Sequence, residues 1–252
     1  MESAQKDILT ILEQGDISIQ GEFLWGSNYT FLAQVTHAGQ SIPAVYKPVR
    51  GERPLWDFPT ASLAGREAAA YLVSEALAWN LVPPTIYRQK APVGPGSLQA
   101  FIEHDPEYHY FAFSEEDRQR LRPAALFDLL INNADRKGSH ILIGSDNRLW
   151  LIDHGVCFHI EEKLRTVIWD FAGEPLPADL CASLAEFRGR WLTSEDGQGA
   201  ARLANSPLAQ ALRAYLSMAE VQALARRLDA IVAQGVFPSP NPYRRPYPWP
   251  QI

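Results

Sequence analysis

Three polar side chains in the middle of the chain have the types and spacing that phosphoryl transfer requires. Asp135 follows an apolar, helix-like run, His140 comes five positions later, and Asp153 ends a strand-like run just before Gly155. In this chemistry one carboxylate orients the attacking hydroxyl group, and a second carboxylate with another ligand holds Mg²⁺ against the phosphates. We therefore expect Asp135 to act as the base, and Asp153 and His140 to bind the metal.

Each of these residues also has a purely structural interpretation. Asp135 is typical of a turn or a helix cap, Asp153 can cap the turn after its strand, and His140 can be a packing histidine. A hairpin is expected over 141–153, and it would bring His140 and Asp153 together. This joint arrangement favours the chemical interpretation, whereas His154 is expected to be structural or to support the metal site indirectly.

The elements before this region predict a small antiparallel sheet with one main helix. A short amphipathic helix is expected over 3–14, and a longer Ala- and Leu-rich helix over 62–80, capped by Ser62 and ended by two prolines at 83–84. Strand-like runs separated by turn residues fill much of the rest of this part. These runs cover 17–25, 29–36, 42–48, 85–88 and 97–103.

The second part of the chain is mainly helical. Apolar residues at helical spacing predict helices near 123–133, 182–191, 207–215 and 219–234, around the short hairpin. Strands with one helix, followed by helices with a small embedded hairpin, describe a two-lobed α+β protein.

Composition limits the alternatives. Hydrophobic residues make up 46% of the 252 residues, which predicts a substantial core, and the net charge of −6 argues against a nucleic-acid partner. Only two cysteines are present, so neither a zinc cluster nor a disulfide framework is indicated. The polar N-terminus and the lack of long apolar runs predict a cytoplasmic protein without stable membrane insertion.

Two segments of this sequence carry a resemblance to a known family. NADRKGSH and LIDHG resemble the catalytic and metal-binding loops of the phosphatidylinositol 3-/4-kinase-like branch of kinases. Type II phosphatidylinositol 4-kinases, HipA-type kinases and small bacterial members are similar in these loops. The resemblance extends from the first strands to about residue 173. It implies a two-lobed protein-kinase-like fold with ATP between an N-lobe over 1–103 and a C-lobe over 104–252.

The resemblance also assigns roles to individual residues. Lys47, in AVYKP, takes the place of the phosphate-binding lysine, and Glu67 takes that of its acidic partner, with Glu75 as an alternative. Asp135 becomes the base and Asp153 the metal ligand. Two further groups would contact ATP. The phosphate-covering turn is Gly26, Ser27 and Asn28, and the adenine-binding hinge is Phe101, Ile102 and Glu103.

One departure from the family pattern leaves alternatives open. His140 stands where the family has Asn, and imidazole suits softer divalent metals than Mg²⁺. The sequence therefore predicts Mg²⁺ or Mn²⁺ as the metal, with a catalytically weak pseudokinase or an adenylyl transferase as alternatives to a kinase. The hydroxyl-bearing acceptor stays open between lipid, protein and metabolite.

The remaining polar and aromatic residues have weaker interpretations. Arg136 and Lys137 are expected either to contact phosphate or to form a solvated charge pair. His104 and His109 predict a polar loop near the cleft rather than a metal site. The Pro-rich tail VFPSPNPYRRPYPWPQI is expected either to bind a protein partner as an extended segment or to pack back on the body.

Overall fold

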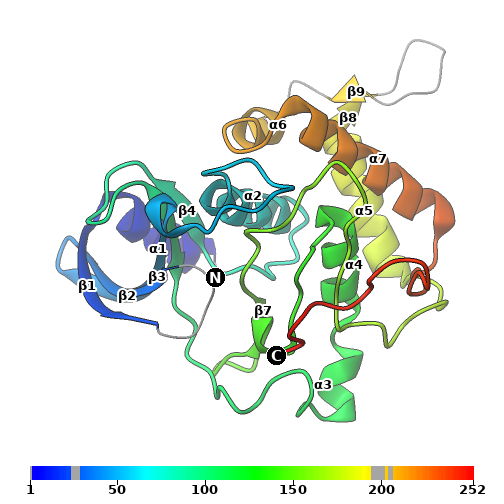
Figure 1. The fold of residues 1–252 in the computed structure, drawn as a ribbon, viewed down its shortest axis with the longest axis horizontal. Helices are drawn as coiled ribbons and strands as arrows, with labels where there is room; N and C mark the ends of the chain where they lie inside the picture. The colour runs from blue at the N-terminus through cyan, green and yellow to red at the C-terminus, as the bar shows by residue number, and fades with distance from the viewer. Residues whose placement is uncertain (1, 24–28, 194–201, 204–206) are drawn as a thin grey trace.

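An antiparallel sheet builds the first half of the protein (Figure 1). The computed structural model describes residues 2–23, 29–193, 202–203 and 207–252. Within these residues the strand order of the large sheet is β1-β2-β3-β5-β4. The strands are β1 (Asp16–Glu22), β2 (Phe31–His37), β3 (Gln40–Pro48), β4 (Thr85–Arg88) and β5 (Gly96–Ala100). The predicted α+β class and sheet are therefore confirmed, although the predicted strand over 97–103 stops at Ala100.

The β2–β3 hairpin shows how local sequence sets this sheet. His37 pairs with Gln40, and the two residues between them, Ala38 and Gly39, have φ values of 48° and 81°. A two-residue turn of this kind matches the right-handed twist of the flanking strands. One face of the sheet buries alternate apolar residues against Ile11 and Leu12 of α1 (Glu2–Gln14).

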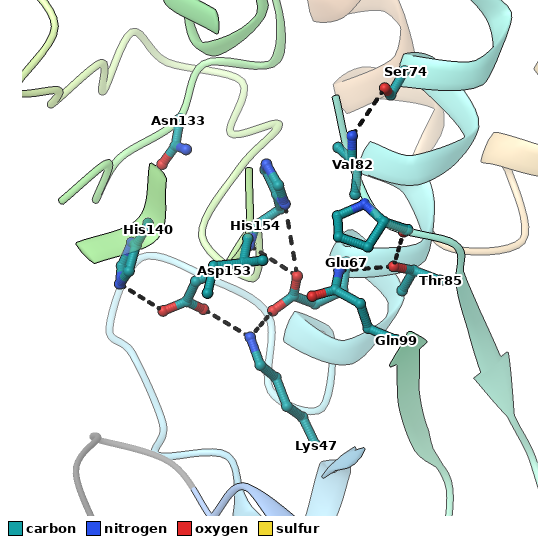
Figure 2. Close-up of polar contacts among 12 residues, drawn as sticks. Lys47, Glu67, Ser74, Val82, Thr85, Gln99, Asn133, His140, Asp153 and His154 are labelled. Atoms are coloured by element: carbon teal, nitrogen blue, oxygen red, sulfur yellow. Dashed lines mark hydrogen bonds and ion pairs between the residues drawn. The ribbon is translucent and has the colours of Figure 1, made fainter. Parts of the chain in front are cut away.

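Helix α2 (Leu63–Ala76) is shorter than the predicted 62–80. After it, the Ser74 hydroxyl accepts hydrogen bonds from the backbone N–H groups of Leu81, at 2.8 Å, and Val82, at 3.2 Å (Figure 2). These bonds fold the chain back along the helix and leave Ala78 and Asn80 in left-handed backbone conformations. The helix therefore ends before the prolines that were expected to end it.

The start of α2 is capped by a different residue from the one predicted. The Ser62 hydroxyl donates to the carbonyl oxygen of Pro59 and forms no capping bond. A carboxylate oxygen of Glu52 instead accepts from the N–H of Ala64 at 2.8 Å. The cap comes from a residue twelve positions away, which a local capping pattern does not include.

Helix α2 joins the two halves of the protein. Its residues Ala69, Ala70 and Val73 belong to the large apolar core that also contains the C-terminal helices. Arg66 of α2 donates to the carbonyl oxygen of Cys157 at 2.7 Å and forms a buried ion pair with Glu220. The boundary between lobes at 103/104 stays a prediction, since α2 packs with both sides.

Helices are the main regular elements of the second half, with α4, α5 and α7 side by side (Figure 1). Helix α4 ends at Asn132, whose φ is 56°, and α7 begins with a reciprocal Ser217–Glu220 capping box. No helix in the described ranges is long and apolar enough to cross a membrane. The helices and short elements are α3 (Glu115–Gln119), α4 (Arg122–Ile131), α5 (Ala178–Trp191), α6 (Pro207–Leu212), α7 (Met218–Gln234), the 3-10 turns Val49–Gly51 and Gly138–His140, and strands β6 (Ile141–Ile143), β7 (Leu149–Leu151), β8 (Leu192–Thr193) and β9 (Arg202–Leu203).

The Pro-rich tail packs back on the body through its backbone. The carbonyl oxygen of Pro246 accepts from Thr166 N at 3.0 Å, and that of Gln251 accepts from Gly138 N at 2.7 Å. Tyr243 and Trp249 nevertheless remain 95% and 77% exposed. The tail is thus held by main-chain hydrogen bonds and by the buried ring of Phe237, while Tyr243 and Trp249 stay exposed to solvent.

The Arg66–Glu220 pair predicts an acid-sensitive fold. Burial opposes ionisation of Glu220, but the hydrogen bond and charge of Arg66 outweigh it and lower the pKa of Glu220. A lowered folded-state pKa stabilises the fold above the unfolded value of 4.5, and that stabilisation is lost as pH falls. We expect Glu220→Gln to reduce the free energy of unfolding by about 1–3 kcal/mol at pH 7 and by less at pH 3, in urea titrations.

Glu186→Gln provides the control, because Glu186 is exposed and its ion pair with Arg190 spans 3.8 Å at the surface. This control is expected to change stability by less than about 1 kcal/mol at either pH. If Glu220→Gln lowers the free energy of unfolding equally at pH 7 and pH 3, the stabilisation does not come from the ionised Arg66–Glu220 pair.

Candidate active site

A cavity of about 330 Å³ lies between the large sheet and the β6–β7 hairpin. Predicted site residues from both halves line it, namely Lys47, Glu67, Phe101, Ile102, His140 and Asp153. Glu103 does not line it, and its carbonyl oxygen accepts from Ser145 N at 3.0 Å. The structure therefore brings most of the predicted residues to one cavity but leaves Glu103 outside its lining.

Lys47 is the centre of the charged cluster in this cavity (Figure 2). It lies on β3, and its Nζ forms ion pairs with Glu67 of α2 and, at 3.1 Å, with Oδ1 of Asp153. Burial alone would lower the pKa of Lys47, but the charges of Asp153 and Glu67 raise it above its ordinary value. Lys47 is therefore a fixed cation. The alternative partner Glu75 does not line the cavity.

Asp153 follows β7 in an unusual backbone conformation. Its φ is 61°, in the left-handed region that only a few residue types such as Asp and Asn tolerate well. Burial would raise the pKa of Asp153, but the neighbouring charge of Lys47 lowers it far below its ordinary value. The side chain is 48% exposed, so this permanent carboxylate is accessible from the cavity.

The ring of His140 faces Asp153. Its Nδ1 contacts two backbone groups, the carbonyl oxygen of Asp135 at 3.1 Å and the N–H of Lys137 at 3.5 Å. Burial lowers the pKa of His140 to about 4, so the ring is neutral. Its Nε2 lies 3.3 Å from Oδ2 of Asp153. An imidazole nitrogen and a carboxylate oxygen are both groups that bind divalent cations.

The metal-ligand set is small. Among the described residues, no group of three or more His, Cys, Asp and Glu is arranged to hold a metal ion. Asp153 and His140 are thus two adjacent donor side chains, fewer than a site made of protein ligands alone requires. His104 also lines the cavity, and its Nδ1 lies 2.8 Å from the carbonyl oxygen of Ile102.

Asp135 lies beside this cluster, outside the cavity lining. Its backbone N–H donates to Oδ1 of Asn133 at 2.9 Å, and its carboxylate pairs with Lys137 at 3.4 Å. Burial raises the pKa of Asp135 to about 6, although the charge of Lys137 acts in the opposite direction. The side chain is partly exposed, which leaves the carboxylate accessible to an incoming hydroxyl group.

Arg136 has neither of its predicted roles. It is fully buried and pairs with the equally buried Asp128 of α4 at 3.0 Å. It also donates to the carbonyl oxygens of Ile152, at 2.6 Å, and His140, at 3.2 Å, and contacts Nε2 of His154 at 2.8 Å. Arg136 is therefore an internal support that holds the two predicted loops against each other.

His154 extends this support to the charged cluster. Burial and the adjacent Arg136 keep its pKa well below the ordinary value, so the ring is neutral. Its backbone N–H donates to Oε2 of Glu67 at 2.8 Å (Figure 2). His154 was expected to be structural or to support the metal site indirectly. Its contact with Arg136, and the pairing of Arg136 with Asp128, were not predicted.

Several cavity residues were not predicted at all. Leu142 and Ile152 of the hairpin region line the cavity, as does Gln99, whose amide donates to the Thr85 hydroxyl at 2.8 Å. Alternation along the short strands was the available signal for the first two. The predicted turn of Gly26, Ser27 and Asn28 lies outside the described residues and remains a prediction.

Comparison with known proteins gives one sequence relative. No family model matches the chain. Protein Rv2133c of Mycobacterium tuberculosis is 40% identical over an alignment of 275 positions, which covers 95% of this chain and 94% of the relative.

Solved structures with similar folds include two that are named as kinases. The Golgi casein kinase with Mn and ADP bound has a TM-score of 0.53 at 14% identity, covering 100% of this chain and 81% of that chain. Hydra Fam20 with sugar has a TM-score of 0.59 at 14% identity, with coverages of 93% and 89%. The Helicobacter pylori proinflammatory kinase CtkA has a TM-score of 0.53 at 10% identity, with coverages of 90% and 94%. The chain thus has a two-lobed kinase-like fold.

The buried position of Arg136 predicts a large stability effect. We expect Arg136→Met to lower the free energy of unfolding by about 3–5 kcal/mol, because Asp128 is left buried without its counter-ion. The double variant Asp128→Ala/Arg136→Met should be more stable than Arg136→Met alone. Urea titration of the complete double-mutant cycle measures this coupling.

Arg188→Met is the control, since Arg188 pairs with Asp229 in a half-exposed position. Its expected cost is about 0–1 kcal/mol. Equal costs for Arg136→Met and Arg188→Met would show that Arg136 is not an internal support.

Proposed function

The chain belongs to the family of protein Rv2133c from Mycobacterium tuberculosis, and we propose that it is an ATP-dependent phosphotransferase that moves the γ-phosphoryl group to a hydroxyl acceptor. The observation that carries this proposal is the ion-pair cluster of Lys47 with Glu67 and Asp153 at a cavity between the sheet and the hairpin. The kinase-like fold supports it. A fixed cation and a permanent carboxylate at one cavity suit a polyphosphate with its counter-ion.

Each residue has a role in this proposal. Lys47, held by Glu67, binds phosphate oxygens. Asp135 orients the acceptor hydroxyl and accepts its proton. The hinge residues Phe101 and Ile102 contact the adenine, near the proposed lobe boundary at 103/104. Ser27 and Asn28 cover the phosphates.

A divalent metal completes the proposed site. Asp153 and His140 would hold Mg²⁺ or Mn²⁺, which when bound neutralises negative charge on the phosphates. The position of the His140 ring, whose Nε2 lies 3.3 Å from Oδ2 of Asp153, supports this assignment. So does the Golgi casein kinase of similar fold, which is described with Mn and ADP bound.

The family relation proposed from the sequence is more specific than the fold. We propose that the chain lies in the phosphatidylinositol 3-/4-kinase-like branch, on the basis of the loops NADRKGSH and LIDHG. The acceptor in this proposal is defined by its hydroxyl group, on a lipid, a protein or a metabolite. A protein partner for the exposed tail rings, Tyr243 and Trp249, is a further part of it.

Nucleotide binding is the first test. We expect calorimetry to detect ATP binding that requires Mg²⁺ or Mn²⁺ and weakens by at least about tenfold in Asp153→Asn, because the metal loses a charged ligand. Asp146→Asn is the matched control, since Asp146 is an exposed carboxylate in the turn of the same hairpin. Metal-independent binding would favour a pseudokinase, and absence of binding would overturn the proposed ATP site.

Transfer is tested with ATP labelled at the γ- or the α-phosphate. We expect label only from the γ-position, and about a 10²- to 10⁴-fold loss of turnover in Asp135→Asn with ATP affinity retained, as for removal of a general base. Label from the α-position would identify an adenylyl transferase instead.

Metal preference tests the role of His140. Replacing imidazole by an oxygen ligand in His140→Asn should shift the ratio of ATP affinities from Mn²⁺ toward Mg²⁺, because Mg²⁺ prefers oxygen. Calorimetry with each metal gives this ratio directly. A ratio identical to that of the wild type would remove His140 from the ligand set.

A further inference from the structure

A second cavity, of about 640 Å³, lies in the helical half of the protein. Its walls come from the segment 160–169 after β7, from α7 and from the tail residues 238–246. Figure 1 shows the red tail passing close to this yellow-green segment and the end of α7, and Thr166 N donates to the carbonyl oxygen of Pro246 at 3.0 Å. None of the proposed ATP-site residues lines it. We call it the basic cavity, because Lys and Arg side chains make up much of its lining.

The basic cavity concentrates positive charge in a protein that is acidic overall. The chain has 23 basic and 29 acidic residues, yet the lining contains one carboxylate, Glu162, among its described residues. Like charges that line one cavity repel one another, and a bound anion would offset that repulsion. The basic lining residues are Lys163, Arg165, Arg226, Arg227, Arg244 and Arg245.

Only part of this charge is neutralised by the protein. Lys163 pairs with Asp57 at 2.9 Å, and Arg244 pairs with Glu162 at 3.3 Å. In the described part of the chain, the side chains of Arg165, Arg226 and Arg245 form no hydrogen bond or ion pair. Three guanidinium groups therefore line one cavity without a counter-ion.

Arg227 adds a fourth cation that is held in a fixed position. Its Nε donates to the carbonyl oxygen of Leu130 at 2.9 Å, and its Nη1 donates to that of His159 at 3.1 Å. Its Nη2 is buried and has no hydrogen-bond partner among the described residues. Burial lowers the pKa of Arg227 to about 10, so the side chain is still a cation at neutral pH. A buried donor without a partner is costly, and an anionic ligand would compensate the charge around it.

We propose that the basic cavity binds a small molecule that carries several phosphate groups. Guanidinium groups recognise phosphate through paired, charge-assisted hydrogen bonds. The volume matches that of small-molecule sites rather than of an open protein-binding surface. Apolar wall residues such as Trp169 and Ile231 provide contact for the uncharged part of the ligand. The phosphates can belong to a free molecule or to a lipid headgroup.

Binding is measured by calorimetry with tripolyphosphate in the presence of a chelator, so that metal-dependent binding at the ATP site is suppressed. We expect Arg226→Ala/Arg245→Ala to weaken tripolyphosphate binding by at least about tenfold, since two charge-assisted contacts are lost. Both side chains are exposed, so the fold should be preserved. The control Lys6→Ala/Arg213→Ala removes the same charge from exposed positions outside the cavity and should change affinity less than about twofold.

Further measurements locate the site and its ligand source. Hydrogen exchange should show added protection in 160–169 and 238–246 when tripolyphosphate binds. Lys47→Met should leave this binding unchanged, which separates the basic cavity from the proposed ATP site. Preferential binding to phosphatidylcholine vesicles containing phosphatidylinositol 4,5-bisphosphate, lost in Arg226→Ala/Arg245→Ala, would identify a lipid source. Equal loss in both double variants, or loss only in Lys47→Met, would overturn the proposal.

Discussion

The arrangement of the candidate site depends on one buried cation. Arg136 has no exposed surface, and burying a charge is costly unless every part of it is paired. Its acceptors are Asp128, the ring of His154 and the carbonyl oxygens of His140 and Ile152. Those two carbonyls belong to the two chemically important loops. The requirement to satisfy one guanidinium group therefore sets the distance between these loops.

From Arg136 a series of hydrogen bonds and ion pairs leads to the sheet. Neutral His154 contacts Arg136 with its ring and Glu67 with its backbone N–H, and Glu67 in turn pairs with Lys47. Lys47 also pairs with Asp153, which has a left-handed backbone conformation just after the end of β7. Glu67 lies on α2, and the ion pair of Arg66 with Glu220 attaches the same helix to α7. This ion pair therefore also helps to position Glu67. The cluster thus couples the sheet, α2 and the hairpin through ion pairs rather than through packing alone.

The sequence predicted the residues whose signal is local and missed those whose partners are distant. The proximity of His140 and Asp153 was predictable because a hairpin joins them, and the pairing of Lys47 with Glu67 followed from the family resemblance. Arg136 was misread because it stands next to Lys137 in a polar loop, while its carboxylate partner is on α4 and its other acceptors include backbone carbonyls. Every residue has a backbone carbonyl group, so residue type does not reveal which carbonyl will accept a hydrogen bond. The early end of α2 was missed for a similar reason, since one hydroxyl group, that of Ser74, folds the following chain back.

The same segment that lines the basic cavity also supports the loop around Asp135. The backbone of Arg165 binds this loop on both sides of Asp135, accepting from Arg136 N and donating to the carbonyl oxygen of Asn133, each at 2.9 Å. Its side chain lies in the basic cavity lining. The next residue, Thr166, donates its backbone N–H to the carbonyl oxygen of Pro246 in the tail. The carbonyl oxygen of Gln251, also in the tail, accepts from the N–H of Gly138 in the loop NADRKGSH. An anion bound at the proposed site would therefore contact a segment whose backbone is hydrogen-bonded on both sides of Asp135. If that anion changes the affinity of the candidate active site for its ligand, linkage requires the ligand to change the anion affinity by the same factor.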